Sequence, residues 1–458
     1  MTEVRDKDTE FKINSMLDNL GTKAEKNNYI NPELYGKHNV KIGLRNSDGT
    51  GVLVGLTEIG DVHAYVMEDN LKVPVDGRLF YRGIDTYELV AGFQNEKRFG
   101  FEECCYLLLF GELPHKTQLE EFTWLLAEHR NLPSSFTRDL ILKAPSRDIM
   151  NKIARTILST YSYDENPDDI SIKNVLRQSI EVIARLPILA AYGYQAFAHY
   201  YEGKSLYIHN PQHELSTAEN ILYMLRPDSK YTRAEAEILD LALVLHAEHG
   251  GGNNSTFAIH VVTSTGTDTY SAIAAGLGSL KGPKHGGANI KVMKMMDDIK
   301  EHIKDWEDED ELTTYLEKII NRQAFDKSGL IYGMGHAVYT VSDPRAVLLK
   351  KKAKELAAEQ GFTKEFELFE RVEKLSPEVF NKAKNNNKLI SANVDFYSGF
   401  VYKMLGIPME LYTPIFAIAR VAGWCAHRLE ELVDSSKIIR PAYKSISEMK
   451  NYVPLNER

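Results

Sequence analysis

Apolar residues recur every three to four positions over long stretches of this chain. The spacing is that of a helix with one buried face, and it is clearest at residues 114–130, 169–201, 233–249 and 345–361. Pro187 stands inside the second stretch, where we expect it to kink or split the helix. Several stretches are apolar on nearly every side, which predicts helices packed between other helices.

One region has a different pattern. The segments VHAYVM at 62–67 and GRLFYRG at 77–83 resemble two short strands around a turn. With helical patterns elsewhere, the sequence predicts an all-α fold with a large multi-helix domain and a minor β-hairpin near residues 60–83.

The helices change in character after residue 286. From there to about residue 406 they carry more charge, and the last 50 or so residues return to an apolar pattern. We therefore predict a large helical domain from residues 1–286 plus 407–458, and a smaller helical domain, residues 287–406, inserted between its two parts.

Composition narrows the class of protein. Of the 458 residues 43% are hydrophobic, and the net charge is -9, which argues against a nucleic-acid-binding protein. The three cysteines make no disulfide framework and indicate a reducing compartment. No signal peptide is recognisable, and no apolar run reaches the roughly 18 residues of a membrane span. We expect a cytoplasmic protein without a membrane or nucleic-acid partner.

Two histidines are flanked by glycines. His285 lies in KGPKHGGAN, ahead of an amphipathic run, and His336 lies in GMGHAV. A helix N-terminus keeps a nearby imidazole neutral, and glycines let a ligand approach closely. Either histidine can serve as a hydrogen-bond donor to an oxyanion, or fill an ordinary structural place in a turn.

Three arginines are candidate carboxylate ligands. Asp343-Pro344 is a good helix start, so Arg345 falls in the first helical turn, where an anion is welcome and a cation is not. Arg420 lies in the apolar run IFAIARVAGW and needs a partner if buried. Each of these two serves a bound carboxylate or pairs with a protein acid. Arg440, before a proline, reads most simply as a surface ion pair.

Asp395 begins an apolar helix in NVDFYSG. It is either the helix N-cap or a general base, and a base would need partial burial to raise its pKa. His246 and His249 stand three positions apart, but no third ligand has diagnostic spacing, so we expect no metal site.

Taken together, these motifs resemble the citrate synthase family. The similarity runs in order through YRGIDTYELV, CCYLLLFGELP, HGGGNNS, GPKHGGAN, GMGHAV, DPR, NVDFYSG and IIRP. It implies a large and a small helical domain that close over the substrates, a homodimer, and no cofactor, because the coenzyme A thioester is itself a substrate.

The resemblance also implies residue roles. His285 and Asp395 would enolise acetyl-CoA, and His336 would polarise the ketone of oxaloacetate. His249, Arg345, Arg420 and Arg440 would bind oxaloacetate, with Arg440 supplied by the partner subunit. Weaker candidates for coenzyme A contacts are Leu330, Ile331, Tyr332, Gly333, Met334, Lys388 and Asn393.

The implied reaction is the condensation of acetyl-CoA with oxaloacetate and water to give citrate, an early step of the tricarboxylic acid cycle. A close alternative is 2-methylcitrate synthase, which uses propionyl-CoA. A distant one is a metal-dependent hydrolase with His246, His249 and His285 as ligands.

Overall fold

The computed structural model describes residues 7–46, 49–69, 71–336, 338–434 and 437–458. The chain divides into two units, Met1–Leu56 and Thr57–Arg458. The described part of the first unit holds two helices and one 3-10 turn: α1 (Lys7–Asn27), α2 (Glu33–Lys37) and η1 (Ile42–Leu44). No side chain of α1 is buried.

The second unit begins with the predicted hairpin. Strands β1 (Gly60–Glu68) and β2 (Leu71–Tyr81) pair antiparallel, and the short β3 (Ile84–Asp85) extends the sheet. The prediction of a minor β-hairpin near residues 60–83 is therefore confirmed.

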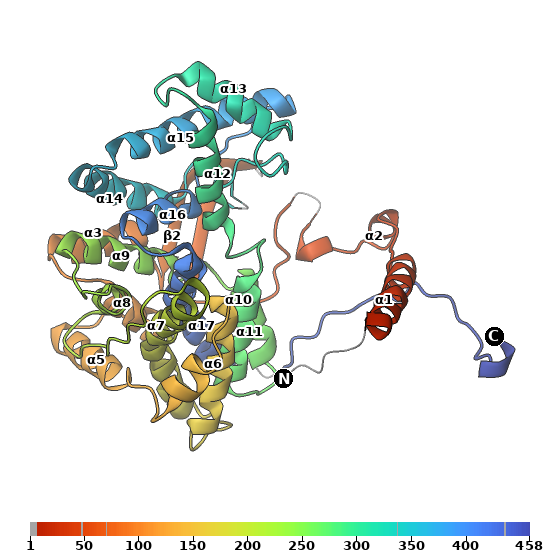
Figure 1. Cartoon of the computed structure of the whole chain (residues 1–458), viewed down its shortest axis with the longest axis horizontal. Helices are drawn as coiled ribbons and strands as arrows, with labels where there is room; N and C mark the ends of the chain where they lie inside the picture. The colour runs from red at the N-terminus through yellow and green to blue at the C-terminus, as the bar shows by residue number, and fades with distance from the viewer. Residues whose placement is uncertain (1–6, 47–48, 70, 337, 435–436) are drawn as a thin grey trace. The chain divides into compact units, whose positions relative to one another are not determined.

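Helices make up most of the remainder, which confirms the all-α fold (Figure 1). The helices before residue 290 are α3 (Thr86–Asn95), α4 (Phe101–Phe110), α5 (Lys116–Glu128), α6 (Ile149–Thr160), α7 (Ile172–Glu202), α8 (Thr217–Leu225), α9 (Arg233–His246), α10 (Asn254–Thr263), α11 (Thr269–Lys281) and the start of α12 (Ala288–His302). They are followed by α13 (Glu309–Ile320), α14 (Pro344–Gln360), α15 (Thr363–Lys384), α16 (Val394–Met404) and α17 (Tyr412–Asp434). A π-helix, η2 (Thr137–Leu142), and three short 3-10 helices, η3 (Tyr161–Tyr163), η4 (Met409–Leu411) and η5 (Leu455–Glu457), complete the described elements.

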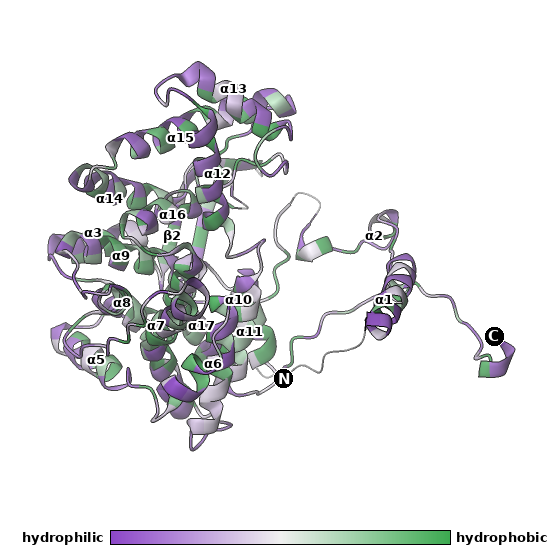
Figure 2. Ribbon diagram, viewed as in Figure 1, coloured by the Kyte–Doolittle hydropathy of each residue, from purple (hydrophilic) through white to green (hydrophobic). Residues whose placement is uncertain are grey.

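Helix α17 is the centre of the core. It packs against α4, α7, α9, α10 and α11, and its residues are buried without a break from Tyr412 to Leu429. A helix this apolar is stable only when other helices cover every side. Figure 2 shows the hydrophobic colouring concentrated in this interior.

Of the two effects expected of Pro187, a kink or a split, the split is wrong, because α7 runs uninterrupted for 31 residues through that position. Pro187 and its neighbours are buried. Burial of apolar surface against α6, α8 and α17 therefore outweighs the hydrogen bond that proline removes.

Helices α12 to α16 gather at one end of the second unit in Figure 1 and carry much of its hydrophilic surface in Figure 2. Here α13 packs on α15, and α16 packs on α12 and α14. Helix α14 also packs on α9 and β2, so this group is in direct contact with the rest of the unit. The boundary of a separate small domain at 287–406 stays a prediction.

Candidate active site

A short backbone ladder joins two of the predicted motifs. Residues 333–335 and 391–393 run antiparallel, and two backbone hydrogen bonds of 2.8 and 2.9 Å connect them. Gly333 has φ +79°, and a Cβ there would lie 2.8 Å from side chains of two packed helices, so glycine is required. The ladder holds the segment that carries His336 beside the segment that leads into Asp395.

The proton on His336 can be assigned from geometry. Its Nδ1 accepts hydrogen bonds from the backbone N–H groups of Val338 and Tyr339, at 3.0 and 3.1 Å. A nitrogen that accepts carries no proton, so the ring proton is on Nε2. Burial lowers the pKa of His336 to about 4, aided by the charge of Arg345. His336 is thus a neutral ring with one N–H available to a ligand.

Asp395 lies in the first turn of α16, whose N-cap is Asn393. The simpler interpretation of Asp395 as the helix cap is therefore wrong. Its Oδ1 is shut off from solvent and finds no hydrogen-bond partner among the described residues. Burial raises the pKa of Asp395 to about 6, although Arg345 and Arg420 oppose that rise. A carboxylate with this pKa and an unused oxygen has the properties of a general base.

His285 is held by Ser255 at the start of α10. The Oγ of Ser255 lies 3.1 Å from Nε2 of His285, 3.3 Å from Nε1 of Trp424 and 2.9 Å from Oδ1 of Asn253. The indole N–H only donates, so the hydroxyl proton goes either to Asn253 or to His285. In the second case the histidine proton lies on Nδ1, free for a ligand.

The pKa of His285 is lowered to about 4, chiefly by burial and secondly by the charge of Arg420. Helix α12 begins three residues further on, at Ala288. The pKa is lowered as predicted, and burial is its largest cause.

Arg345 lies in the first turn of α14, with Asp343 as N-cap, as predicted. Both are buried, and two hydrogen bonds of 3.0 and 2.8 Å run from Nε and Nη2 of Arg345 to the Asp343 carboxylate. The Nη1 group takes no part in this pair. Asp343 also accepts from the backbone N–H of Val394 at 3.2 Å, which ties α14 to the start of α16. The ion pair fixes the direction of the guanidinium.

Arg420 is fully buried in α17 without an ion pair to any described acid. Its Nε donates to the carbonyl of His246 at 2.7 Å, whereas Nη1 and Nη2 have no hydrogen-bond partner among the described residues. The guanidinium stacks over Phe416 at 4.8 Å. Burial lowers its pKa to about 10, so it remains charged at neutral pH. A buried cation with two unused nitrogens is a good binding group for a carboxylate.

His249 completes the group of histidines. Its ring meets His336 edge-on at 5.3 Å between centroids, and its buried Nε2 has no partner among the described residues. Burial holds its pKa well below the usual range. Nearby His246 donates from Nδ1 to the carbonyl of Ala242 at 2.7 Å and is likewise neutral, with a pKa of about 3 caused by burial.

Electrostatics also place these groups together. Besides burial, which is the main cause in each case, the charge of Arg345, Arg420 or both lowers the pKa of five groups. They are His246, His249, His285, His336 and Asp395. The structure therefore gathers all the predicted acid and base candidates around two buried cations.

Arg440 is exposed in the C-terminal segment and makes no hydrogen bond or ion pair with the described residues. Within one chain it is not part of this cluster. Among the predicted coenzyme A contacts, Leu330 is exposed and Lys388 is accessible, whereas Ile331 is buried and offers only its backbone. Tyr332 donates to Asp326 at 2.7 Å.

Three side chains at the site escaped sequence reasoning. Ser255 holds His285, Tyr339 stacks on His336 at 4.8 Å, and Phe416 lies against both His246 and Arg420. Ser255 is the last residue of the HGGGNNS motif, so the motif could have identified it as a site residue. Phe416 looks like any other apolar residue of its helix until the fold is known.

The metal-site alternative finds no support in the placement of its ligands. In the part of the chain that the structure describes, one group of three potential metal ligands comes together, and it comprises His260, His427 and Glu430. None of His246, His249 or His285 belongs to it.

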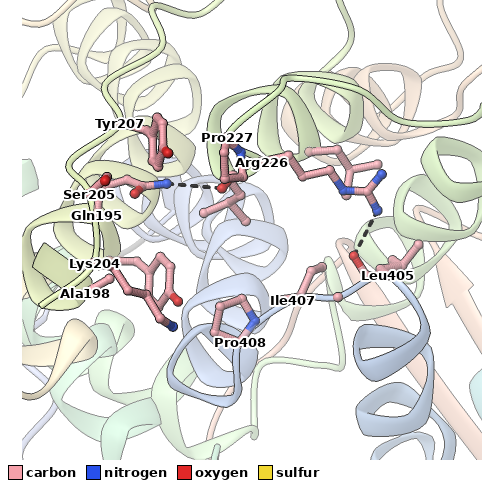
Figure 3. Close-up of a pocket in the computed structure, with 14 residues that line it drawn as sticks. Gln195, Ala198, Lys204, Ser205, Tyr207, Arg226, Pro227, Leu405, Ile407 and Pro408 are labelled. Atoms are coloured by element: carbon pink, nitrogen blue, oxygen red, sulfur yellow. Dashed lines mark hydrogen bonds between the residues drawn. The ribbon is translucent and has the colours of Figure 1, made fainter. Parts of the chain in front are cut away.

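A separate pocket of about 320 Å³ lies between α7, α8 and the residues that follow α16 (Figure 3). Arg226 donates to the carbonyl of Leu405 at 2.9 Å on one side of it. None of the predicted site residues lines this pocket. Its wall includes residues 405–408, where the predicted small domain ends.

Comparisons with known proteins agree with the fold. The family model "Citrate synthase, C-terminal domain" matches residues 47–442. A citrate synthase of Synechocystis sp. is 37% identical over 84% of this chain and 89% of its own length. A 2-methylcitrate synthase of Corynebacterium glutamicum is 33% identical, covering 84% of this chain and 94% of its own.

A solved structure is also similar. It is the ternary complex of carboxymethyl coenzyme A and oxaloacetate with citrate synthase from Thermoplasma acidophilum, with a TM-score of 0.73 and 26% identity, covering 92% of this chain and 99% of that one. The class of protein is thus an all-α enzyme that transfers an acyl group. This chain belongs to the citrate synthase family.

Proposed function

We propose that this enzyme condenses acetyl-CoA with oxaloacetate and water to form citrate and free coenzyme A. The observation that carries the proposal is a set of buried polar atoms that find no hydrogen-bond partner among the described residues: Nη1 and Nη2 of Arg420, Nε2 of His249 and Oδ1 of Asp395. The charge of Arg420 acts on both His249 and Asp395. Such atoms are costly in a folded protein unless a ligand satisfies them.

Oxaloacetate supplies what the cationic groups lack. Its carboxylates accept from Arg420 and from the Nη1 of Arg345, and its ketone oxygen accepts the Nε2–H of His336. Because burial and the nearby cations keep the histidines neutral, they donate hydrogen bonds without losing a proton. Hydrogen bonding to the ketone oxygen makes the ketone carbon more electrophilic.

Asp395 and His285 act on the thioester. Asp395 takes a proton from the acyl methyl group, while His285 donates its Nδ1–H to the carbonyl oxygen and Ser255 donates to its Nε2. With a pKa of about 6, the carboxylate is mostly ionised at neutral pH yet more basic than an ordinary aspartate. The enolic carbon then attacks the ketone carbon, and water hydrolyses the thioester of the product.

The length of the acyl group distinguishes the two candidate functions. The relative named 2-methylcitrate synthase 1 is 33% identical to this chain, so a propionyl substrate is the specific alternative. One methylene in a pocket changes binding by about 1–3 kcal/mol. We expect a higher kcat/KM for acetyl-CoA than for propionyl-CoA.

The direct test is the release of free thiol from each acyl-CoA, with and without oxaloacetate. The proposal requires release with acetyl-CoA only when oxaloacetate is present. Equal release without oxaloacetate would indicate a simple thioester hydrolase, and a clear preference for propionyl-CoA would assign the alternative function.

The assembly completes the proposal. We infer a homodimer in which Arg440 of one chain contributes to the partner's oxaloacetate site, supported by the exposure of Arg440 and its lack of an intrachain partner among the described residues. We also propose a cytoplasmic enzyme of the tricarboxylic acid cycle that needs no cofactor. No helix in the described part of the chain is long and apolar enough to cross a membrane.

A further inference from the structure

A second cluster of titratable side chains lies between α10 and the end of α17, outside the catalytic group. His260 of α10 and His427 of α17 face each other, with 3.1 Å between Nε2 of His260 and Nδ1 of His427. Oε2 of Glu430 lies 3.7 Å from the same Nδ1. The ligand atoms that these three residues offer all lie within 4.8 Å of one another.

The outer nitrogen of each ring is already committed. Nδ1 of His260 lies 2.7 Å from Oε2 of Glu431, and Nε2 of His427 lies 3.0 Å from Oε1 of Glu248. A carboxylate only accepts, so each outer nitrogen carries a proton. The inner nitrogens, Nε2 of His260 and Nδ1 of His427, then direct their lone pairs at each other. This arrangement requires a positive charge between them, either one shared proton or a metal ion.

Glu430 favours the metal ion. Its Oε1 is occupied, because it accepts the backbone N–H of Glu58 at 2.8 Å. Its Oε2 is buried and has no hydrogen-bond partner among the described residues. A shared proton gives His427 a positive charge, but Oε2 of Glu430 lies 3.7 Å from its Nδ1, beyond hydrogen-bond distance, whereas a metal ion can be coordinated by all three inner atoms.

We propose that Nε2 of His260, Nδ1 of His427 and Oε2 of Glu430 form a binding site for a borderline divalent cation of the Zn²⁺ or Co²⁺ type. Two imidazoles and one carboxylate are a common ligand set for such ions, and tetrahedral ligands stand roughly 3.3 Å apart. The spacing in this cluster requires only small side-chain shifts.

The surroundings meet the other requirements of a metal site. Glu431 and Glu248 hold the outer N–H of each ring, which is the usual support of a metal-bound histidine. Gly251 leaves space in front of the cluster, since a Cβ there would lie 3.5 Å from Nε2 of His260. His427 is fully buried, but the side chain of Glu430 is 19% exposed and provides a way in for the ion.

The site would have a structural role. It ties α10, which carries Ser255, to α17, which carries Arg420, and through His427 it holds Glu248 next to His249. It takes no part in the proposed reaction, so it stands whether or not that reaction is correct.

The test is titration of chelator-treated full-length protein with Co²⁺, followed by its visible absorption. We expect one equivalent per chain with the intense bands of a four-coordinate ion, held by the three side chains and one water molecule, and Zn²⁺ should displace it. His260→Gln and Glu430→Gln should lose this equivalent, whereas Glu431→Gln, which removes only a supporting carboxylate, should weaken binding about 10–100-fold.

The matched control is His199→Gln, because His199 is an exposed histidine on α7 and should bind as wild type does. Glu430→Gln changes a single atom of a partly exposed side chain, so it tests the site without emptying the core. Failure of the wild-type protein to bind Co²⁺, or full binding by Glu430→Gln, would overturn the proposal and leave a shared proton as the occupant.

Discussion

Helix α17 carries two fully buried arginines, two turns apart, with opposite surroundings. Arg428 donates from all three guanidinium nitrogens, to Oγ1 of Thr269 at 3.2 Å, Oγ1 of Thr263 at 3.1 Å and the carbonyl of Thr267 at 2.7 Å. Among the described residues, Arg420 finds an acceptor for Nε alone. Burial lowers the pKa of both to about 10.

The difference separates a structural cation from a ligand-binding one. Arg428 has its hydrogen bonds inside the protein, so the fold itself accounts for it. Arg420 lowers the stability of the ligand-free fold, because hydrogen bonds do not fully compensate for the burial of its charge. Nε2 of His249 and Oδ1 of Asp395, on which the charge of Arg420 acts, also lack a hydrogen-bond partner among the described residues. We interpret these atoms as groups that bind the substrate.

The largest expected effect on activity comes from replacing Asp395, whose Oδ1 has no hydrogen-bond partner among the described residues. Asp395→Asn should lower kcat by about 10²–10⁴ because it removes the general base while preserving shape. Thiol release in steady state measures it. The matched control is Asp240→Asn: Asp240 is also buried, but it accepts the backbone N–H groups of Gly100 and Phe101 at 2.7 and 3.1 Å. Similar losses of kcat in both folded variants would contradict our assignment of the base.

Arg420→Met comes next. It should lower kcat/KM for oxaloacetate by about 30- to 5000-fold, the effect of roughly 2–5 kcal/mol for a lost buried charge partner. Its free energy of unfolding without ligand should stay near that of wild type or rise, because an uncompensated charge is removed. Steady-state kinetics test the loss of kcat/KM, and chemical denaturation tests the stability separately.

Arg428→Met should have the opposite pattern, with lower stability and nearly unchanged activity. The change leaves two threonine hydroxyls and a carbonyl without donors, at about 1–3 kcal/mol for each group that stays unsatisfied. We expect a lower midpoint of denaturation and, for the protein that remains folded, kcat/KM within a few-fold of wild type. Loss of oxaloacetate binding at unchanged stability would reverse the roles that we give to the two arginines.

The pH dependence is a smaller effect. Because burial raises the pKa of Asp395 to about 6, kcat/KM should fall about tenfold per pH unit below that value as the base is protonated. The raised pKa also means that the folded state binds this proton more tightly than the unfolded state does. Its stabilising contribution, about 3 kcal/mol, is present below pH 4 and is lost as pH rises through 6. Asp395→Asn should remove that component from the stability profile, and an unchanged profile would argue against a buried carboxyl.

Local signals in the sequence predicted much of the fold and the candidate site. Aspartate as N-cap and proline as first helical residue are favoured at helix starts, so the place of Arg345 after Asp343-Pro344 was predictable. The sequence did not show that α7 would continue through Pro187, because the packing that stabilises it comes from distant helices. For Asp395 the sequence left two interpretations open, and the structure excludes the helix cap because Asn393, two residues earlier, fills that place.

Other features depend on residues far apart in the chain. His260 and His427 are 167 positions apart, and neither has a motif that points to the other. The neutrality of His285 follows from burial, which a single local segment does not reveal. Whether Arg420 would find a protein acid was likewise open until its neighbours were known.

The thermal shift that oxaloacetate produces tests the role of Arg420 most directly. A ligand that binds only the folded state raises its stability, and the increase depends on affinity. Saturating oxaloacetate should raise the melting temperature of wild type and of Arg428→Met by similar amounts, and leave Arg420→Met unchanged. An equal shift in Arg420→Met would contradict the view that this buried, unpaired guanidinium exists to bind the substrate.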